Sequence, residues 1–365
     1  MFPNDWYVAP LGELATIRSG GTPSRSTPAY WGGDIPWVTT GEVKGATITT
    51  AQECITRKGL ERSAARLERT GTILIALYGQ GPTRGRVARL GIEAATNQAC
   101  AAIAPRSALL SEFLFHFLIG NYDSLRGLSN KGSQDNLSGA LIKRFEISVP
   151  PIPEQCAISE ALSDADRLLG EMKALIAKKR AVKQAVMQLL LTGKTRLLDV
   201  GGEWEMKQIN NLATVDPENL SSSTDPDFSF NYISLEQVDA GRLLGVSVEV
   251  FRTAPSRARR VLRHDDVLMS TVRPNLMAHL HFTSQIPLAV CSTGFAVLRA
   301  RPDAANAGYL FAHLFGYVVN SRIERILAGS NYPAISSRDV RMIELPCPPT
   351  VAEQTAIAAV LSDMD

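Results

Sequence analysis

Two patterns of apolar residues divide this 365-residue chain. Over most of its length, short β-branched and apolar runs, such as residues 72–76, alternate with turns rich in Gly, Pro, Ser and Thr. This pattern predicts short strands, with an occasional short amphipathic helix such as residues 111–118. From residue 154 to about residue 191 proline is absent and apolar residues recur at heptad spacing. The pattern therefore predicts an α+β protein, in which two mixed α/β domains are joined by one long helix.

The long helix should carry an apolar seam that packs against another helix, because residues three and four apart share one helix face. The seam consists of Ile158, Leu168, Met172, Leu175, Val182, Val186 and Leu189. Pro153 suits the start of this helix and Gly193 suits its end. Roughly 37 helical residues would span about 55 Å. Such a helix can serve as a spacer or a docking post; a helix folded onto its own domain is the alternative.

One sequence string occurs twice. The pattern E-Q-x-A-I-x-x-x-L-S-D-x-D begins at Glu154 and again at Glu353, 199 positions later. Shorter matches, among them Trp6 with Trp204, relate the two halves at similar offsets. The repeat predicts a duplicated domain. The expected parts are a first mixed α/β domain at 1–152, a spacer helix at 153–198, a second such domain at 199–350 and the start of a second helix at 351–365.

Composition is that of an ordinary globular protein, with 45% hydrophobic and 20% charged residues. Because the net charge is only +2, binding to nucleic acid would need local basic surfaces. No apolar run approaches the length of a membrane span, which leads us to expect a cytoplasmic protein with no membrane partner. The five cysteines are scattered, and reduced thiols are expected.

Three patterns suggest catalysis or ligand binding, each weakly. Gly79 and Gly81 follow an apolar run, but the spacing of a nucleotide-binding glycine loop is absent. Asp34, Glu42 and Lys44 resemble the acid pair and lysine of Mg²⁺-dependent nucleases. His279 and His281 have no third ligand at metal-site spacing. The chain also contains no Walker A motif and no Asx-Pro-Pro-aromatic motif of an amino-methyltransferase.

Basic and amide-bearing residues recur in loops at matching positions of both halves, which favours DNA binding. Arg and Lys neutralise phosphates, while Arg, Asn and Gln can make bidentate contacts with bases. In the first half the candidates are Thr22, Ser24, Arg25, Lys44, Arg57, Lys58, Tyr78, Gln80, Arg84, Arg86, Lys131, Gln134 and Asn136. In the second half they are Arg257, Arg259, Arg260, Arg273, Asn275 and Asn331. No catalytic or metal-ligating residue is predicted.

Several motifs resemble one known family. Gly-Gly-Thr-Pro-Ser at 20–24, Gly-Asp-Ile-Pro-Trp-Val at 33–38, Ala-Thr-Asn-Gln-Ala at 95–99 and Pro-Pro-Ile-Pro-Glu-Gln at 150–155 follow one another along the chain. Met-Gln-Leu-Leu-Leu-Thr-Gly-Lys-Thr at 187–195 closes the central helix. In this order the motifs resemble the specificity subunits of type I restriction-modification systems, and the resemblance covers essentially the whole chain.

The resemblance implies a non-catalytic subunit that reads double-stranded DNA. The two α/β domains would be target-recognition domains, each of which binds one half of an asymmetric bipartite site. The helices would dock two methyltransferase subunits. S-adenosylmethionine, ATP and Mg²⁺ would be bound by partner chains, which include restriction and translocase subunits. The alternatives are a self-contained nuclease or methyltransferase fragment on the same scaffold, and a structural protein without DNA-sequence preference.

Overall fold

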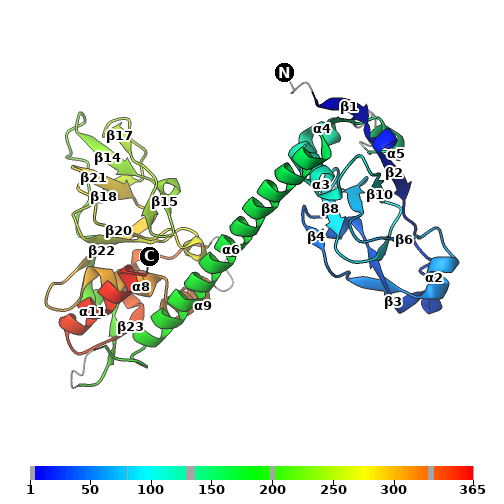
Figure 1. The fold of residues 1–365 in the computed structure, drawn as a ribbon. Helices are drawn as coiled ribbons and strands as arrows, with labels where there is room; N and C mark the ends of the chain where they lie inside the picture. The colour runs from blue at the N-terminus through cyan, green and yellow to red at the C-terminus, as the bar shows by residue number, and fades with distance from the viewer. Residues whose placement is uncertain (1–4, 80, 129–135, 198–201, 328–332, 365) are drawn as a thin grey trace. The chain divides into compact units, whose positions relative to one another are not determined.

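The computed structural model describes residues 5–79, 81–128, 136–197, 202–327 and 333–364. The chain forms two compact units, Met1–Lys173 and Ala174–Asp365, which meet within one long helix. Both units combine short helices with β-sheets, as Figure 1 shows, which confirms the predicted α+β class. No described helix combines the length and the apolar character needed to cross a membrane.

Unit 1 is built mainly from strands. They are β1 (Tyr7–Pro10), β2 (Ala15–Ser19), β3 (Trp31–Val38), β4 (Thr47–Ile48), β5 (Glu53–Ile55), β6 (Leu67–Glu68), β7 (Ile73–Ala76), β8 (Val87–Leu90), β9 (Ala94–Thr96), β10 (Cys100–Pro105) and β11 (Glu146–Val149). Its helices are α1 (Leu11–Leu14), α2 (Arg57–Glu61), α3 (Ser111–Gly120), α4 (Tyr122–Gly127) and α5 (Gly139–Lys143), with 3₁₀ turns η1 (Pro28–Tyr30) and η2 (Thr40–Glu42).

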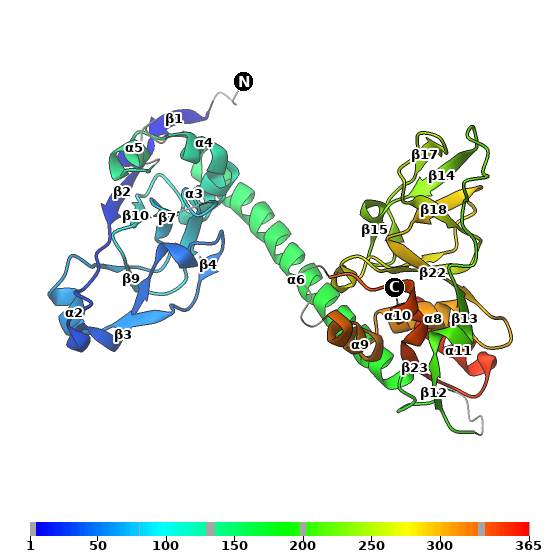
Figure 2. The same ribbon diagram turned by 180° about the vertical axis from the view of Figure 1, so that it is seen from behind.

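Unit 2 repeats this plan (Figure 2). Its strands are β12 (Glu205–Gln208), β13 (Ala213–Val215), β14 (Ser229–Ile233), β15 (Val238–Asp239), β16 (Arg242–Leu243), β17 (Ser247–Val250), β18 (Ala258–Val261), β19 (Asp266–Ser270), β20 (Leu280–Phe282), β21 (Ala289–Ser292), β22 (Phe295–Ala300) and β23 (Glu344–Cys347). Its helices are α7 (Ile209–Leu212), α8 (Ala307–Leu314), α9 (Tyr317–Leu327), α10 (Ser337–Met342) and α11 (Val351–Ser362), with turns η3 (Leu235–Gln237) and η4 (Pro274–Leu276).

The order of strands in the sheets shows the duplication directly. One sheet of unit 1 runs β2-β10-β7-β8-β4, and unit 2 has β13-β22-β19-β20. The second sheets are β5-β3-β9-β6 and β17-β14-β21-β18. In each second sheet the same neighbours, β3 with β9 and β14 with β21, are parallel. The two halves therefore share one topology, as the repeated sequence indicates.

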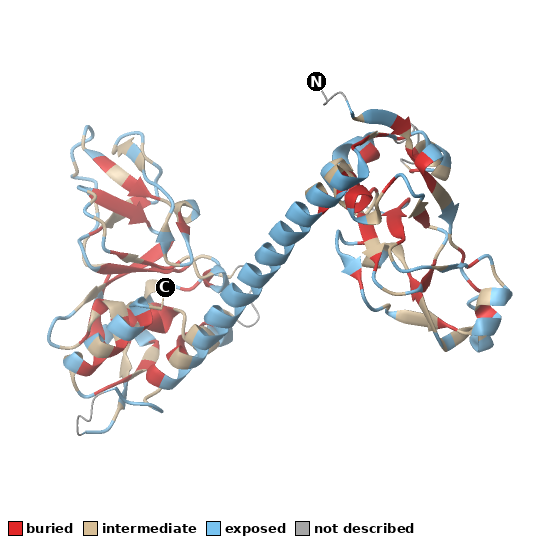
Figure 3. Ribbon diagram, in the orientation of Figure 1, coloured by how far each residue is buried: buried red, intermediate tan, exposed pale blue. Residues whose placement is uncertain are grey.

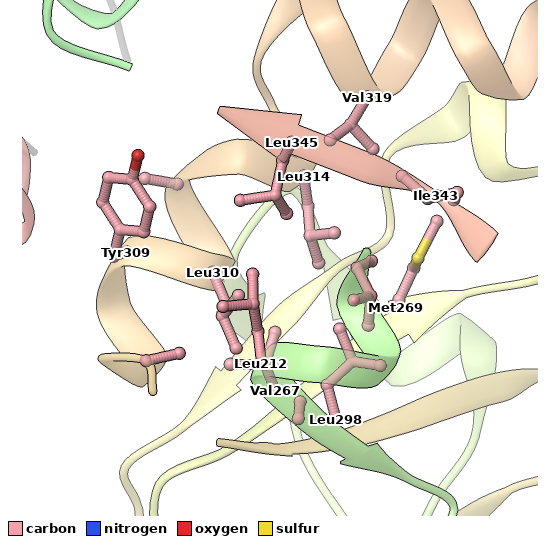
Figure 4. Close-up of a cluster of buried hydrophobic side chains, with 14 of the residues drawn as sticks. Leu212, Val267, Met269, Leu298, Tyr309, Leu310, Leu314, Val319, Ile343 and Leu345 are labelled. Atoms are coloured by element: carbon pink, nitrogen blue, oxygen red, sulfur yellow. The ribbon is translucent and has the colours of Figure 1, made fainter. Parts of the chain in front are cut away.

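The cores lie where the longest apolar runs become central strands. β7 is buried at every position, and so is its counterpart β19. In unit 2, Val267 and Met269 of β19 pack with Leu310 and Leu314 of α8 and with Leu345 of β23, as Figure 4 shows. A strand whose two faces are both covered has apolar residues at consecutive positions, as β7 and β19 do.

The predicted long helix is α6 (Ile152–Leu190), whose ends lie within two residues of the apolar pattern at 154–191, whereas the spacer segment expected to reach residue 198 extends eight residues past the helix. It ends as expected of a glycine stop: Gly193 takes a left-handed φ of +71° and donates a backbone hydrogen bond to Leu190 O at 3.3 Å. Its middle is exposed over many consecutive residues, drawn pale blue in Figure 3.

The predicted seam of α6 divides into packed and exposed positions. Ile158 packs against the unit 1 core and Val186 against the unit 2 core. Leu168, Met172, Leu175, Val182 and Leu189 are each more than 40% exposed. The alternative of a helix folded entirely onto its own domain therefore does not describe α6 in either unit.

The repeated Glu-Gln dipeptide anchors a helix in each unit. Gln155 accepts a hydrogen bond from Leu110 N at 2.8 Å and donates to Ala108 O at 3.0 Å and Pro150 O at 2.9 Å. Gln155 is fully buried, and its amide is satisfied by three main-chain groups, of which the Pro150 carbonyl is itself buried. The string found in the sequence is thus a structural clamp.

Gln354 repeats the clamp in unit 2. It accepts from Asn306 N at 2.9 Å and donates to Ala304 O at 3.1 Å, just before α8. Its third contact differs, because Nε2 lies 3.3 Å from Cys347 Sγ instead of a carbonyl oxygen. Equivalent glutamines therefore fix the starts of two helices: Gln155 holds α6 in unit 1, and Gln354 holds α11 in unit 2.

Candidate nucleic-acid interface

Main-chain hydrogen bonds gather the candidate loops of each unit. In unit 1, Leu77 N donates to Ala99 O at 2.8 Å, and Leu137 N donates to Leu77 O at 3.1 Å. The loop after β7 therefore lies between the β9–β10 turn and residue 137. We call this arrangement the loop frame.

Unit 2 has the same frame. Thr271 N donates to Gly294 O at 2.8 Å, and Ile335 N donates to Thr271 O at 2.9 Å. These residues follow the unit 1 set by 194, 195 and 198 positions. The same main-chain bonds form in both units although the exposed side chains of the loops differ, and in unit 2 Thr271 Oγ1 also donates to Gly294 O at 2.8 Å.

The loop at residues 20–26 of unit 1 is held tightly by its surroundings. A Cβ atom on Gly20 would lie 2.1 Å from Thr96 O, and one on Gly21 would lie 2.3 Å from the Ala64 carbonyl carbon. Two indole N–H groups also bind the loop: Trp37 donates to Gly21 O at 3.0 Å and Trp31 donates to Ser24 O at 3.1 Å. The glycines of the Gly-Gly-Thr-Pro-Ser motif are thus required by close backbone approach.

The side chains of this loop are exposed and already organised. Thr22 donates to Gln98 Oε1 at 2.5 Å, which joins this loop to the β9–β10 turn. Ser24 Oγ lies 2.8 Å from Ser26 Oγ. Arg25 forms a two-point ion pair with Glu53 at 2.5 and 3.1 Å, and its guanidinium lies 3.6 Å from the ring centre of Trp31. Thr22, Ser24 and Arg25 are therefore brought together on one surface.

The other unit 1 candidates lie at several places. Arg57, on α2, pairs with Glu61 at 3.3 Å, and Lys58 beside it is exposed. Lys44 and Tyr78 are exposed, whereas Arg84, Arg86 and Asn136 are half-buried. Gln80, Lys131 and Gln134 fall outside the described residues. The start of α2 is joined to η1, just after the 20–26 loop in the chain, because its N-cap residue Thr56 donates from Oγ1 to Ala29 O at 2.8 Å.

The glycines after β7 allow backbone conformations that other residues rarely adopt, and this explains them without a phosphate-binding loop. Gly79, Gly81 and Gly85 all have positive φ angles. The matching loop of unit 2 has no glycine, yet Arg273 and Met277 take left-handed φ angles of +50° and +52°. Both loops therefore need left-handed residues, and unit 2 accepts the strain that a side chain adds there.

In unit 2 the loop frame brings several candidates near one another. Arg273 N donates to Pro333 O at 2.7 Å, and Thr293 N donates to Arg257 O at 2.8 Å. The exposed candidates are Arg257, Arg273 and Asn275. Asn275 lies within the turn η4, and Arg273 is the residue just before it. Asn331 lies outside the described residues.

Two arginines of unit 2 are engaged inside the protein. Arg260 is ion-paired with Asp216, and Ser337 Oγ donates to the same carboxylate at 2.6 Å. Burial lowers the pKa of the Arg260 guanidinium. Arg259 is half-buried, donates to Ala258 O at 2.7 Å and lies 4.8 Å from the ring centre of Phe251. Arg260 is thus held in a structural network, and we do not carry it into the interface.

One of the possible nuclease residues, Glu42, caps a 3₁₀ turn. Glu42 accepts hydrogen bonds from Thr39 N at 2.8 Å, Thr39 Oγ1 at 3.0 Å and Gln52 N at 2.9 Å, which caps η2. In unit 2 the neutral amide of Gln237 caps η3 in the same way, through Ser234 N at 2.8 Å. Because an uncharged amide serves equally well, this position needs hydrogen-bond acceptors rather than a metal-binding charge.

The two histidines considered as ligands also differ in environment. His279 is buried and accepts a hydrogen bond from Ser270 N at 3.1 Å, and burial lowers its pKa to about 4. His281 is paired with Asp265 at 2.6 Å. Across the described ranges, no three His, Cys, Asp or Glu residues are grouped as a metal site.

A hollow of about 660 Å³ lies in unit 2, beside the C-terminal half of α6. Its apolar lining includes Met187 of α6, Phe311 of α8, Phe315 just after α8, and Ala358 of α11. Arg180 and Arg242 also line it. This volume lies in the range of sites that hold ligands or partner side chains.

Sequence reasoning missed Glu53 and Gln98 as members of the unit 1 surface. Gln98 stood within a recognised motif, next to loop residues that match in the other half. Glu53 carried no such signal, because an acidic residue counts against a DNA-binding loop. Its register directly opposite Trp37 in the β3–β5 pair, which places it beside Arg25, is known only from the fold.

Comparisons with known proteins agree with this arrangement. Residues 3–179 match the family model of the type I restriction modification DNA specificity domain. The MjaIX specificity subunit of Methanocaldococcus jannaschii is 32% identical over 176 residues, which cover 47% of this chain and 40% of that protein. The EcoR124I/EcoR124II specificity subunit of Escherichia coli is 26% identical over 181 residues, 48% of this chain and 44% of that protein. These matches each span less than half of the relative's length.

Other comparisons extend over the whole chain. The MjaVIII specificity subunit of M. jannaschii is 18% identical over 381 aligned residues, which cover 100% of this chain and 87% of that protein. The crystal structure of a type I restriction-modification S subunit from M. genitalium aligns with a TM-score of 0.62 at 14% identity, covering 100% of this chain and 91% of the other. At this identity the structural likeness concerns the fold.

Proposed function

Residues 3–179 belong to the type I restriction modification DNA specificity domain family, and on this premise we propose that the chain is the DNA-reading subunit of a type I restriction-modification complex. It carries no catalytic residues of its own. Each unit binds one half of an asymmetric bipartite site in double-stranded DNA. Methyl transfer with S-adenosylmethionine, and ATP- and Mg²⁺-dependent translocation and cleavage, take place on partner subunits.

The observation that carries this proposal is the loop frame, which occurs in both units with different side chains on it. Leu77, Ala99 and Leu137 form the frame of unit 1, where exposed Thr22, Ser24 and Arg25 lie close by. The frame of unit 2 instead presents Arg257, Arg273 and Asn275. Polar side chains of different order on one scaffold suit two different base sequences. An identical pair of units would instead favour a symmetric site.

The proposed docking site for methyltransferase subunits is the exposed part of α6. Leu168 and Met172 are 56% and 52% exposed, and Leu175 follows at seam spacing. Apolar residues at this spacing on a helix favour packing with other helices. The hollow of unit 2, lined by Met187 and Phe311, offers the partner a further apolar contact.

The DNA-reading proposal is tested by selection from a random double-stranded DNA library. The chain is used alone and reconstituted with the methyltransferase subunits of its source organism, at two salt concentrations. We expect two short motifs separated by a fixed unspecified spacer. A single continuous motif contradicts the bipartite reading, and no enrichment contradicts sequence recognition altogether.

The docking proposal is tested by co-purification. Leu168→Ser and Met172→Ser together should weaken association with methyltransferase subunits, because they remove apolar area from the seam. Lys173→Ser, on the same helix, is the matched control for an exposed polar residue. Equal loss of association in the control and the seam variant contradicts docking through the seam.

A further inference from the structure

We propose that Arg25 and Glu53 together read one G·C base pair, Arg25 through the guanine and Glu53 through the amino group of the cytosine. This inference rests on the proposed function, since it names a base-specific contact made by unit 1. It also assigns a role in recognition to a carboxylate, which would otherwise weaken binding to DNA.

The first support is the rigidity of the pair. The Arg25 guanidinium lies 3.6 Å from the ring centre of Trp31 and 5.1 Å from that of Trp37. The two indole rings are in edge contact, with centres 5.1 Å apart. Glu53 lies directly opposite Trp37 across the β3–β5 pair, so its carboxylate meets the guanidinium from a fixed strand. A long side chain that would otherwise lose rotamer entropy on binding is thus already ordered.

The second support is exposure. The side chains of Arg25 and Glu53 are 55% and 41% exposed, although both are firmly held. Trp31 also ties its indole N–H to Ser24 O, so the ring that supports Arg25 is fixed to the motif loop itself. The pair is therefore a rigid polar surface beside Ser24 and Thr22, available to a ligand.

The third support is the count of donors and acceptors. The described contacts with Glu53 use one N–H on each terminal nitrogen of Arg25, out of five N–H groups. Guanine offers two acceptors, O6 and N7, in the major groove, and the cytosine amino group needs one acceptor. A carboxylate has about four acceptor sites, so Glu53 can accept from cytosine while it still binds Arg25. Together the two residues match the pattern of a single G·C pair.

A phosphate contact fits the pair less well. The carboxylate of Glu53 cancels the charge of Arg25, and an added anion beside it meets repulsion. A plain surface ion pair is also an incomplete description, because such pairs stabilise proteins by about 0–1 kcal/mol and need no aromatic support. The Arg57–Glu61 pair on α2 is of that simpler kind, with side chains 85% and 63% exposed.

The experiment compares wild-type full-length chain with Arg25→Ala, Glu53→Ala and the double variant in the DNA-library selection. At one position of the first half-site, the wild type should prefer G·C over other base pairs. Each single variant should show a preference roughly tenfold weaker, which is about the contribution of one bidentate base contact. The double variant should lose little more than either single variant, since both residues read the same pair. The second half-site should be unchanged.

Glu112→Ala is the matched control, because it removes a carboxylate from another unit 1 ion pair, with Arg89 on β8. It should leave every position of the motif unchanged. If Glu53→Ala instead strengthens binding to all sequences equally, the carboxylate is only a repulsive charge and the inference is overturned. If it lowers thermal stability but leaves the motif intact, the pair is structural and the inference is likewise overturned.

These outcomes are separate from failure of the proposed function. A wild-type chain that enriches no motif contradicts the proposed function itself. A wild-type chain with a bipartite motif that neither Arg25→Ala nor Glu53→Ala alters contradicts only the reading of a G·C pair by these two residues.

Discussion

Arg196, in the loop after α6, donates two hydrogen bonds to the fully buried carboxylate of Glu353 on α11, at 2.9 and 2.7 Å. The pair joins residues 157 positions apart within unit 2. In unit 1 the matching Glu154 instead accepts from the indole of Trp6 at 3.0 Å. The second copy of the repeated string thus holds its glutamate with a charged partner where the first copy uses a neutral one.

Replacing Arg196 by Met should destabilise unit 2 by about 3–5 kcal/mol, because it leaves a buried carboxylate without its partner. The double variant Arg196→Met, Glu353→Met should lose less than Arg196→Met alone, since no buried charge remains. Urea denaturation of the wild type, the single variants Arg196→Met and Glu353→Met, and the double variant measures the coupling. Additive losses would show that the two residues act independently.

The glutamine clamps should act locally. Gln155→Met keeps the length of the side chain but removes the partner of Leu110 N, of the buried Pro150 carbonyl and of the Ala108 carbonyl, at a cost of about 2–3 kcal/mol. Hydrogen exchange at Leu110 should accelerate, while exchange at Asn306 in unit 2 stays unchanged. Gln354→Met should give the mirror result. Equal acceleration at both sites in either variant would contradict a local clamp.

Unit 2 should lose stability in mild acid because it buries neutral histidines. Burial lowers the pKa of His279 to about 4 and that of His313 to about 3. In the unfolded chain both titrate near 6.5, so below that pH the unfolded state binds more protons than the folded one. Stability is therefore complete above about pH 6.5 and falls as the pH drops toward 4, by on the order of 1 kcal/mol per pH unit for each histidine.

His313→Phe tests this dependence, since the ring packs edge-on against Tyr309 at 4.6 Å and its Nε2 has no hydrogen-bond partner among the described residues. Urea midpoints between pH 8 and 4.5 should vary less in this variant than in the wild type. An unchanged pH profile would exclude His313 as a source of acid sensitivity.

Arg273 should show opposite effects on stability and on DNA binding. Glycine takes the left-handed conformation of residue 273 without the strain of about 1 kcal/mol that a side chain adds. Arg273→Gly should therefore keep or slightly raise the melting temperature while weakening DNA binding. Met277→Gly relieves a matching strain at φ +52° without removing a guanidinium, and should leave DNA affinity unchanged. Loss of folding in Arg273→Gly would remove the basis for assigning Arg273 to DNA.

The long-period features of the fold could be predicted from sequence, and pairings across long separations could not. The heptad spacing placed α6 within two residues of its observed ends, because helix periodicity is a local property. The capping role of Glu42 was also readable, since Thr39 and Glu42 have capping-box spacing. By contrast, the engagement of Arg260 depends on Asp216, 44 positions away, and that of Arg25 on Glu53, 28 positions away. A loop arginine looks the same in sequence whether its carboxylate partner is near it in space or not.

The loop frame has a consequence for how such a protein can change over evolutionary time. Leu77, Ala99 and Leu137, like Thr271, Gly294 and Ile335, are joined by main-chain hydrogen bonds, and in unit 2 only the buried Thr271 hydroxyl adds a described side-chain bond, to Gly294 O. Mutations in neighbouring exposed side chains therefore leave these bonds intact and carry little stability cost. The DNA sequence that is recognised can therefore change through single substitutions of exposed residues, while the residues of the fold are selected separately. A chain organised in this way can acquire a new DNA preference in one unit without first passing through an unstable intermediate.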